Sequence, residues 1–349
     1  MTVRLRVAAA DWRAHLRRVA AERPGLVPVA KGNGYGFGLD RLAAESQALG
    51  ADTLAVGTGP EVAAVAAFTG QVVVLQPWRA FEPGAERLLG DPRLVHTVSR
   101  VEDLRHLVRS GRRPRVLLEI MTSMRRHGIA VSELGEVRAL LAGDNVELVG
   151  WTIHLPMPAA TGGNLEQAQR LAKAGLAVRQ VPVWFSHVTG PEYAQLRATV
   201  PAGSRLRIGT ALWLGGSALL QATATVLDRH PVRRGEKIGY WQRTVPMDGH
   251  VVIVSGGTAH GIALEAPTAA ATARQRMISA VTGSMEAVGL ARSPFTIDGR
   301  KRWFIEPPHM QSSMVFLPGN HQPPEVGEEI PVELRMTTAH VDEVILTGA

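Results

Sequence analysis

The sequence contains no cysteine among its 349 residues. The chain therefore has no disulfide, no thiolate nucleophile and no cysteine-based metal site, and we predict no metal centre. A cysteine-free chain suits a reducing compartment. The segment Met1–Asp11 carries Arg4 and Arg6 and lacks the apolar core of a signal peptide, so we expect a cytoplasmic protein.

Lysine is also scarce, and the net charge of +7 comes almost wholly from arginine. The arginines are scattered in pairs instead of forming a basic stripe with a reading motif, so we expect no nucleic-acid partner. The uncharged run Ile208–Leu227 is long enough to span a bilayer. Its glycines and threonines make it too polar for that, and we interpret it as a buried strand and helix. We expect no membrane partner.

Short β-branched runs alternate with amphipathic helical patterns through the first two thirds of the chain. Helical patterns such as Leu39–Leu49 and Arg100–Arg109 are each closed by a glycine. Eight such strand–helix units predict a (β/α)8 barrel, and the chain is long enough for a smaller second domain. The predicted strands are Val27–Lys31, Thr53–Val56, Val72–Leu75, Val95–Thr97, Arg115–Glu119, Leu148–Ile153, Val181–Ser186 and Leu206–Ile208.

After roughly Asp228 the pattern changes to short strand candidates separated by Pro and Gly clusters. We therefore predict a barrel over residues 1–228 and a smaller, mainly β domain over residues 229–349, interrupted by a helix around Ala270–Val288. We expect residues 1–10, with the run Val3–Val7, to pair with this second domain. Its predicted strands are Lys237–Tyr240, His250–Val254, Arg302–Ile305, Ser313–Phe316, Ile330–Leu334 and Val341–Leu346.

The first predicted strand ends at Lys31, one of only four lysines in the chain. Active sites of such barrels lie at the C-terminal ends of the strands. A lysine at the inner end of an apolar strand is costly to bury unless it is paired or used covalently, and desolvation would lower its pKa in a way that suits imine formation. From spacing alone, a lysine that reaches solvent from a Gly-rich turn remains an alternative.

The segment Pro28-Val29-Ala30-Lys31-Gly32-Asn33-Gly34-Tyr35-Gly36-Phe37-Gly38 resembles the signature of the alanine racemase family, whose enzymes use pyridoxal 5′-phosphate (PLP). The resemblance covers most of the predicted barrel and, more thinly, the second domain. It implies that Lys31 holds PLP covalently and that Tyr35 supports this lysine.

Further segments resemble the family in chain order, each just past a different predicted strand. Thr122–Gly128 aligns Arg126 with the family arginine that contacts the substrate carboxylate side and a cofactor oxygen, although Met121 replaces the usual aspartate. Taken singly, such residues also suit a core histidine, a salt bridge at the barrel rim or a plain turn. The other cofactor contacts that the resemblance implies are His154 against the pyridine ring, Thr189 in the phosphate loop, Arg207 at the pyridine nitrogen, and Gly209 and Thr210 as phosphate donors.

The resemblance fails in the second domain. Alanine racemases use two bases, the lysine and a tyrosine from the partner subunit, and the position of that tyrosine is Thr258 here. A threonine hydroxyl is far less acidic than a phenol. The nearby His260 is the candidate second base, because imidazole titrates near neutral pH. An aspartate of the family is replaced by Gln311, and a C-terminal tyrosine by Ile345 or by nothing.

These observations predict a PLP-dependent isomerase of the amino-acid racemase or epimerase type with an altered second base. Its activity on free alanine is in doubt. Two alternatives remain: one-sided chemistry such as α-proton exchange or decarboxylation, and a non-catalytic PLP-binding or regulatory protein. The resemblance also implies a homodimer with shared active sites and a small-molecule amino acid or derivative as substrate.

Overall fold

The structure is a computed structural model that describes residues 2–157, 163–264 and 291–348. The predicted helix around Ala270–Val288 lies outside the described residues. The chain consists of two compact units. The barrel unit comprises Arg13–Gly34 and Gly38–Gly215, and the β unit comprises Met1–Trp12, Tyr35–Phe37 and Gly216–Ala349.

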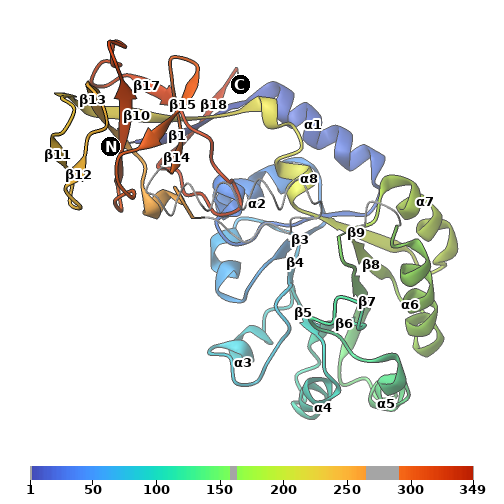
Figure 1. The fold of residues 1–349 in the computed structure, drawn as a ribbon. Coiled ribbons are helices and arrows are strands. Elements are labelled where there is room, and N and C mark those ends of the chain that lie inside the picture. Colours follow the sequence, from blue (N-terminus) through green and yellow to red (C-terminus); the bar gives the residue numbers. More distant parts are fainter. Residues whose placement is uncertain (1, 158–162, 265–290, 349) are drawn as a thin grey trace. The chain divides into compact units, whose positions relative to one another are not determined.

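The barrel unit is built on eight parallel strands in the order β2-β9-β8-β7-β6-β5-β4-β3 (Figure 1). A parallel bridge from Val29 to Ala55 and a hydrogen bond of 2.8 Å from the Ala30 N–H to the Ala55 carbonyl close the ring between β2 and β3. The predicted (β/α)8 class is confirmed. The strands are β2 Leu26–Pro28, β3 Thr53–Val56, β4 Gln71–Val74, β5 Leu94–Val98, β6 Arg115–Glu119, β7 Glu147–His154, β8 Val183–Ser186 and β9 Ser204–Ile208.

Helices follow the strands and lie around the outside of the ring in Figure 1. The predicted helices Leu39–Leu49 and Arg100–Arg109 correspond to α2 and α4. The helices are α1 Ala9–Glu22, α2 Leu39–Ala48, α3 Ala85–Leu88, α4 Val101–Arg109, α5 Leu134–Leu140, α6 Leu165–Val178, α7 Gly190–Thr199 and α8 Thr210–Trp213, with the 3-10 turns η1 Gly34–Gly36, η2 Pro60–Val65, η3 Val131–Glu133, η4 Ser217–Leu219 and η5 Thr258–His260.

The strands alternate between two apolar clusters, one inside the ring and one between the ring and the helices. The inner cluster contains Val27, Val29, Ala55, Val73, Val95, Leu117 and Trp184. Every second residue of a strand points inward, so the residues that follow this layer toward the C-terminal ends line the mouth of the barrel. Lys31 continues the inward series of Val27 and Val29.

The β unit contains an eight-stranded sheet in the order β14-β15-β16-β13-β10-β1-β18, with β17 paired to β10. The run Val3–Val7 forms most of β1, which lies antiparallel to β10 and parallel to β18. The strands are β1 Val3–Ala8, β10 Leu220–Val232, β11 Lys237–Ile238, β12 Arg243–Thr244, β13 Gly249–Ser255, β14 Arg292–Ile297, β15 Arg300–Phe304, β16 Ser312–Pro318, β17 Glu329–Pro331 and β18 Glu343–Thr347.

The structure of the uncharged run Ile208–Leu227 differs from the predicted strand and helix. The α-helix α8 covers only four residues of the run, and the last part of the run forms the start of β10. The domain boundary predicted after residue 228 falls inside β10, whereas the two units divide between Gly215 and Gly216. The alanines and leucines of 218–224 favour a helix locally, but pairing with β1 and β17 determines the strand.

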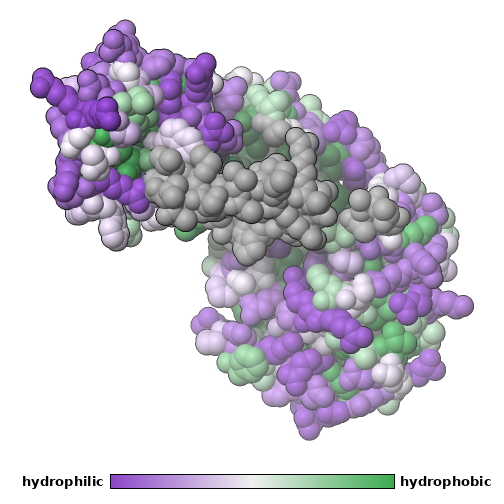
Figure 2. Space-filling model, in the orientation of Figure 1, coloured by the Kyte–Doolittle hydropathy of each residue, from purple (hydrophilic) through white to green (hydrophobic). Residues whose placement is uncertain are grey.

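The visible surface of the molecule is mainly hydrophilic, with small separate groups of hydrophobic residues (Figure 2). Within the part of the chain that the structure describes, no helix combines the length and apolarity that a membrane crossing requires.

A buried histidine gives the barrel unit a predicted pH dependence. Burial lowers the pKa of His96, on β5, to about 4, so the folded state keeps the ring neutral while the unfolded chain binds a proton below its ordinary value of 6.5. Stability is therefore lost as pH falls from about 6.5 toward 4. From pH 7 to pH 4.5 we expect the wild type to lose about 2–3 kcal/mol more free energy of unfolding than H96Q.

Urea titrations at the two pH values measure this difference, and H106Q, at an exposed position on α4, is the matched control. Equal losses for the wild type and H96Q would show that His96 is not held neutral.

Candidate active site at the mouth of the barrel

Five side chains with ionisable or hydroxyl groups lie at the C-terminal ends of barrel strands. They are Lys31 after β2, Glu119 at the end of β6, His154 at the end of β7, Ser186 at the end of β8 and Arg207 in β9. Because the ends of parallel strands meet at one rim, these groups share one electrostatic environment. The pKa of Lys31 responds to Arg207, and the pKa of His154 responds to both Arg207 and Lys31.

Lys31 reaches solvent at this rim but is partly desolvated by the protein around it. This desolvation, with the nearby charges of Arg126 and Arg207, lowers its pKa, and the carboxylate of Glu61 opposes the shift. Glu61, on η2, accepts hydrogen bonds from the N–H groups of Gly32 at 3.1 Å and Gly57 at 2.7 Å. It therefore holds the chain after β2 against the chain after β3, on either side of the closing bridge.

Gly57 leaves space for this arrangement. A Cβ there would lie 2.9 Å from a Glu61 carboxylate oxygen and 3.0 Å from the Lys31 Cβ. A side chain at position 57 would therefore crowd the Glu61 carboxylate and the Lys31 side chain.

A hydrogen-bonded row joins three neighbouring strands at the rim. The hydroxyl of Ser186 lies 2.7 Å from Nδ1 of His154 and accepts a 3.4 Å hydrogen bond from the Arg207 guanidinium. Burial, together with Arg207 and Arg126, lowers the pKa of His154 to about 3, so its ring is neutral at physiological pH. The ring of His187, whose φ is 58°, lies 5.0 Å from that of His154.

Arg207 is buried, and its Nε has no hydrogen-bond partner among the described residues. Burial lowers its pKa to about 10, opposed by the carboxylate of Glu119 and assisted by Arg126. Burial likewise raises the pKa of Glu119. An unpaired buried N–H of a guanidinium is costly, so this donor suits a site that a ligand acceptor completes.

Arg126 stands on a loop whose two ends are bonded together. The N–H of Ile129 donates to the Glu119 carbonyl at 2.7 Å, and the N–H of Met121 donates to the Ile129 carbonyl at 2.9 Å. Gly128 has a φ of 128°, and a Cβ there would lie 2.4 Å from the Met121 nitrogen, so only glycine fits. The side chain of Arg126 is exposed, and its charge acts on Lys31, Glu119 and His154.

The two segments that are predicted to bind phosphate differ in the hydrogen-bond donors that they can offer a ligand. Thr189 caps α7, where its hydroxyl accepts from the Glu192 N–H and its own N–H donates to the Glu192 carboxylate at 2.7 Å. This cap already uses both groups of Thr189 and places a carboxylate beside them. Gly209 and Thr210 begin α8, and the Gly209 carbonyl accepts from the N–H groups of Leu212 and Trp213. First-turn N–H groups have no acceptor within a helix, so this start retains donors.

Tyr35 and His260 belong to the β unit. Tyr35 is buried in η1, with a φ of 54° between two glycines of positive φ. His260 is buried at the end of η5. Its Nδ1 accepts from the Gly257 N–H at 3.3 Å, and its Nε2 lies 3.2 Å from Asp342, which itself accepts from the Val3 N–H. Both ring nitrogens are thus engaged within the unit.

The sequence analysis missed Glu61 and Glu119, and it placed Ser186 only in the segment Ser186–Gly190 that resembles the family's phosphate loop. A signal for Glu119 was present, since it closes a predicted strand just as Lys31 does. Glu61 had no such signal, because its position depends on the turn after β3.

The lowered pKa of Lys31 can be tested directly. In protein freed of any bound aldehyde with hydroxylamine, we expect Lys31 to be acetylated at a lower pH than Lys173, Lys237 and Lys301. Peptide mass mapping across a pH series measures this order. R126M should raise the pKa of Lys31, because it removes a repelling charge, whereas R138M on α5 serves as the control. A Lys31 that reacts in step with the other three would contradict the site electrostatics.

Comparison with known proteins places this chain in a family. A family model described as the N-terminal domain of alanine racemase matches residues 6–215. The alanine racemase of Nitratidesulfovibrio vulgaris is 30% identical over 269 residues, which are 69% of this chain and 70% of that relative.

Solved structures show the same fold. The alanine racemase from Bartonella henselae, determined with covalently bound pyridoxal phosphate, superposes with a TM-score of 0.73 at 16% identity and covers 99% of both chains. The histidine racemase from Leuconostoc mesenteroides gives a TM-score of 0.64 at 17% identity, covering 99% of this chain and 98% of that one. By the family match across most of the barrel and the identity across two thirds of its length, this chain belongs to the alanine racemase family.

Proposed function

We propose that the protein is a PLP-dependent racemase or epimerase that acts at the α-carbon of an amino acid or amino-acid derivative. The observation that carries this proposal is the partly desolvated amine of Lys31, with its lowered pKa, at the barrel mouth beside the unpaired Nε of Arg207. The alanine and histidine racemases among its relatives support this reaction class. Free alanine is the less favoured substrate, since Thr258 and Gln311 replace residues of the family pattern.

The cofactor is PLP, and the residues at the barrel mouth fit it. Lys31 offers an amine whose pKa lies below that of an ordinary lysine, and Arg207 offers a buried N–H donor that suits the acceptor nitrogen of a pyridine ring. Arg126 and Arg207 together provide the positive charge that a phosphate and a carboxylate require. When bound, PLP supplies an electron-accepting ring that allows the Cα–H bond of an attached amino acid to break.

The chain's own residues then have distinct roles. Arg207 remains protonated at neutral pH with a pKa of about 10, so it donates a hydrogen bond without giving up its proton. His154 is neutral and presents a flat ring to the cofactor without adding charge. Nζ of Lys31 takes the α-proton on one face and returns it, and Arg126 orients the substrate carboxylate. Tyr35 supports Lys31, while Gly209 and Thr210 supply N–H donors to the phosphate.

Racemisation also requires a proton carrier on the face of the substrate α-carbon opposite Lys31. The sequence hypothesis assigns it to His260, yet the bonds of both His260 nitrogens favour a structural part for this residue. One-sided α-proton exchange is therefore the second candidate function, favoured by the threonine at position 258. Decarboxylation is disfavoured, because related decarboxylases use a cysteine and this chain has none.

We further propose a cytoplasmic homodimer in which the β unit of one chain completes the barrel mouth of the other. A C2 dimer of this kind would bring residues from both copies to each site. Sedimentation at micromolar protein concentration measures the oligomeric state. A protein that is entirely monomeric under these conditions would contradict the shared site.

Incubation with single enantiomers separates the candidate functions. In D2O with added PLP, we expect the wild type to invert at least one amino acid of a panel of L- and D-forms and to label its α-carbon with deuterium. K31A should lose both activities by at least about 100-fold, because the lysine both binds the cofactor and carries the proton. K173A, on α6, is the control.

Chiral chromatography and mass spectrometry follow the two products. Labelling with retained configuration would establish one-sided exchange, and no turnover of any enantiomer would contradict an enzymatic role.

A further inference from the structure

The β unit holds a second histidine whose environment is the opposite of that of His260. We infer that His309, oriented by the buried carboxylate of Glu306, carries the proton on the substrate face opposite Lys31, in the barrel of a second copy of the chain. The inference rests on the proposed racemase function and on the shared dimer site. It assigns the altered second base to a residue that the sequence pattern did not single out.

The geometry of the pair is that of a histidine and its orienting carboxylate. Nε2 of His309 lies 2.7 Å from Oε1 of Glu306, whose side chain is only 1% exposed. Pro307 and Pro308 separate the two residues and restrict the backbone between them. A buried carboxylate that accepts from one ring nitrogen selects the tautomer whose other nitrogen is free to accept a proton.

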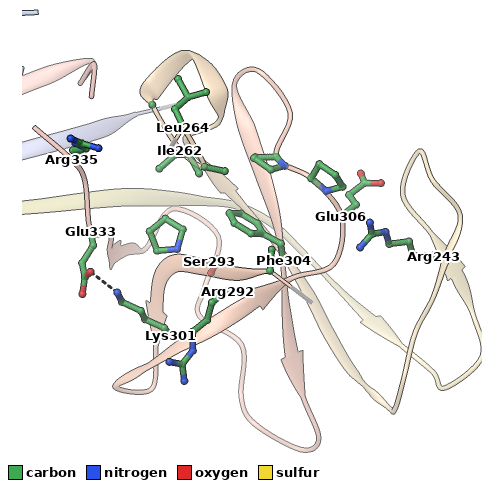
Figure 3. Close-up of a pocket in the computed structure, with 16 residues that line it drawn as sticks. Arg243, Ile262, Leu264, Arg292, Ser293, Lys301, Phe304, Glu306, Glu333 and Arg335 are labelled. Carbon is green, nitrogen blue, oxygen red and sulfur yellow. Dashed lines mark hydrogen bonds and ion pairs between the residues drawn. The ribbon is translucent and has the colours of Figure 1, made fainter. Parts of the chain in front are cut away.

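The carboxylate is held from its other side as well. The second oxygen of Glu306 accepts a 3.4 Å hydrogen bond from the Trp241 N–H, and Gly239, at a φ of 74°, leaves room that a Cβ would fill. Figure 3 shows the guanidinium of Arg243 beside Glu306, at one end of a cavity also lined by Ile262 and Phe304. These contacts hold the Glu306 carboxyl group in the position from which it orients His309.

His309 is more exposed than His260 and has fewer hydrogen-bond partners. Its side chain is 34% exposed, against 8% for His260. Within the described ranges, Nδ1 of His309 has no hydrogen-bond partner, whereas both nitrogens of His260 are bonded. The ring of Tyr240 lies against that of His309, with centroids 5.0 Å apart and planes at 60°. His309 can thus exchange a proton without breaking the hydrogen bond that orients it.

The loop of His309 lies directly on the segment where the family tyrosine is replaced. The Thr258 N–H donates to the His309 carbonyl at 2.9 Å, and the Ala259 N–H donates to the Met310 carbonyl at 3.0 Å. A Cβ at Gly257 would lie 2.0 Å from the His309 oxygen, so the two segments require a glycine at their closest approach. The backbone of His309 therefore lies next to Thr258, the position at which the family pattern has its tyrosine.

The surface around the pair has the character of an interface. Tyr240, Trp241 and Met310 are 85%, 72% and 70% exposed. Large aromatic and methionine side chains gathered on an exposed surface indicate a partner that covers them. We assign this surface to the second copy in the homodimer proposed above.

The protons balance in the proposed inversion step. In one direction Nζ of Lys31 removes the α-proton and protonated Nδ1 of His309 delivers a proton to the opposite face. In the other direction the two residues exchange roles. No oxidant, reductant or co-reactant is needed.

The test compares H309Q and E306Q with the wild type and with H321Q, a control at an exposed histidine of the β unit. The visible absorption of bound PLP is recorded first, and its absence from the wild type would refute the proposed function and not this assignment. With the amino acid that the wild type inverts fastest, H309Q should lose inversion by at least about 100-fold while retaining PLP and one-sided α-deuterium labelling. E306Q should lose inversion less severely.

Two further measurements complete the test. In 15N-histidine spectra of the protein without PLP, His309 should carry its proton on Nε2, and E306Q should reduce this preference. K31A and H309Q are each inactive in inversion. An equal mixture of the two that reassociates at random should recover about a quarter of the wild-type activity, because about half of the dimers are then mixed and one of the two sites in each mixed dimer is intact. Inversion by H309Q within threefold of the wild type, or an Nδ1–H tautomer in the wild type, would overturn the assignment.

Discussion

The candidate active site depends on the placement of one amine at the rim of a closed ring of strands. The bridge between Val29 and Ala55 closes the ring immediately before Lys31, and Glu61 bonds the chain after both strands. Partial desolvation and two neighbouring guanidinium groups then lower the pKa of the lysine. Its readiness to give up a proton is therefore a property of the barrel fold, since each group that produces it sits at a strand end or on the loop after it.

The same rim keeps its other groups in complementary states. His154 is neutral because it is buried beside cations, while Arg207 stays charged despite its burial. Ser186 links the two through a single hydroxyl. Such a row provides a flat neutral ring and a charged donor within one hydrogen-bonded unit, and the unpaired Nε of Arg207 leaves one donor for a ligand.

The fold and much of the site were predictable from the sequence, because alternating apolar runs specify strands and the lysine ends one of them. Glu119 and Ser186 follow from the same rule once every strand end is searched. The start of β10 was misinterpreted although apolar and polar residues alternate from Leu220 to Val226, because its alanines and its lack of charge suggested a buried helix. Thr189 looked free in the sequence, but a capping bond depends on the side chain three residues later.

The pairing of Glu306 with His309 could have been suspected from their spacing, but its significance could not. Only the fold brings the loop of His309 onto Thr258 and buries the glutamate. Conversely, His260 seemed the better base from its distance in sequence to Thr258, yet the fold engages both of its nitrogens. Hydrogen-bond partners distant in sequence decide which of two histidines can exchange a proton.

The most direct measurement of the central claim is borohydride reduction of the protein purified with PLP, followed by peptide mass mapping. The account predicts a reduced pyridoxyl adduct on Lys31 and on no other lysine. An adduct on Lys173, Lys237 or Lys301 alone, or no adduct at all, would contradict it.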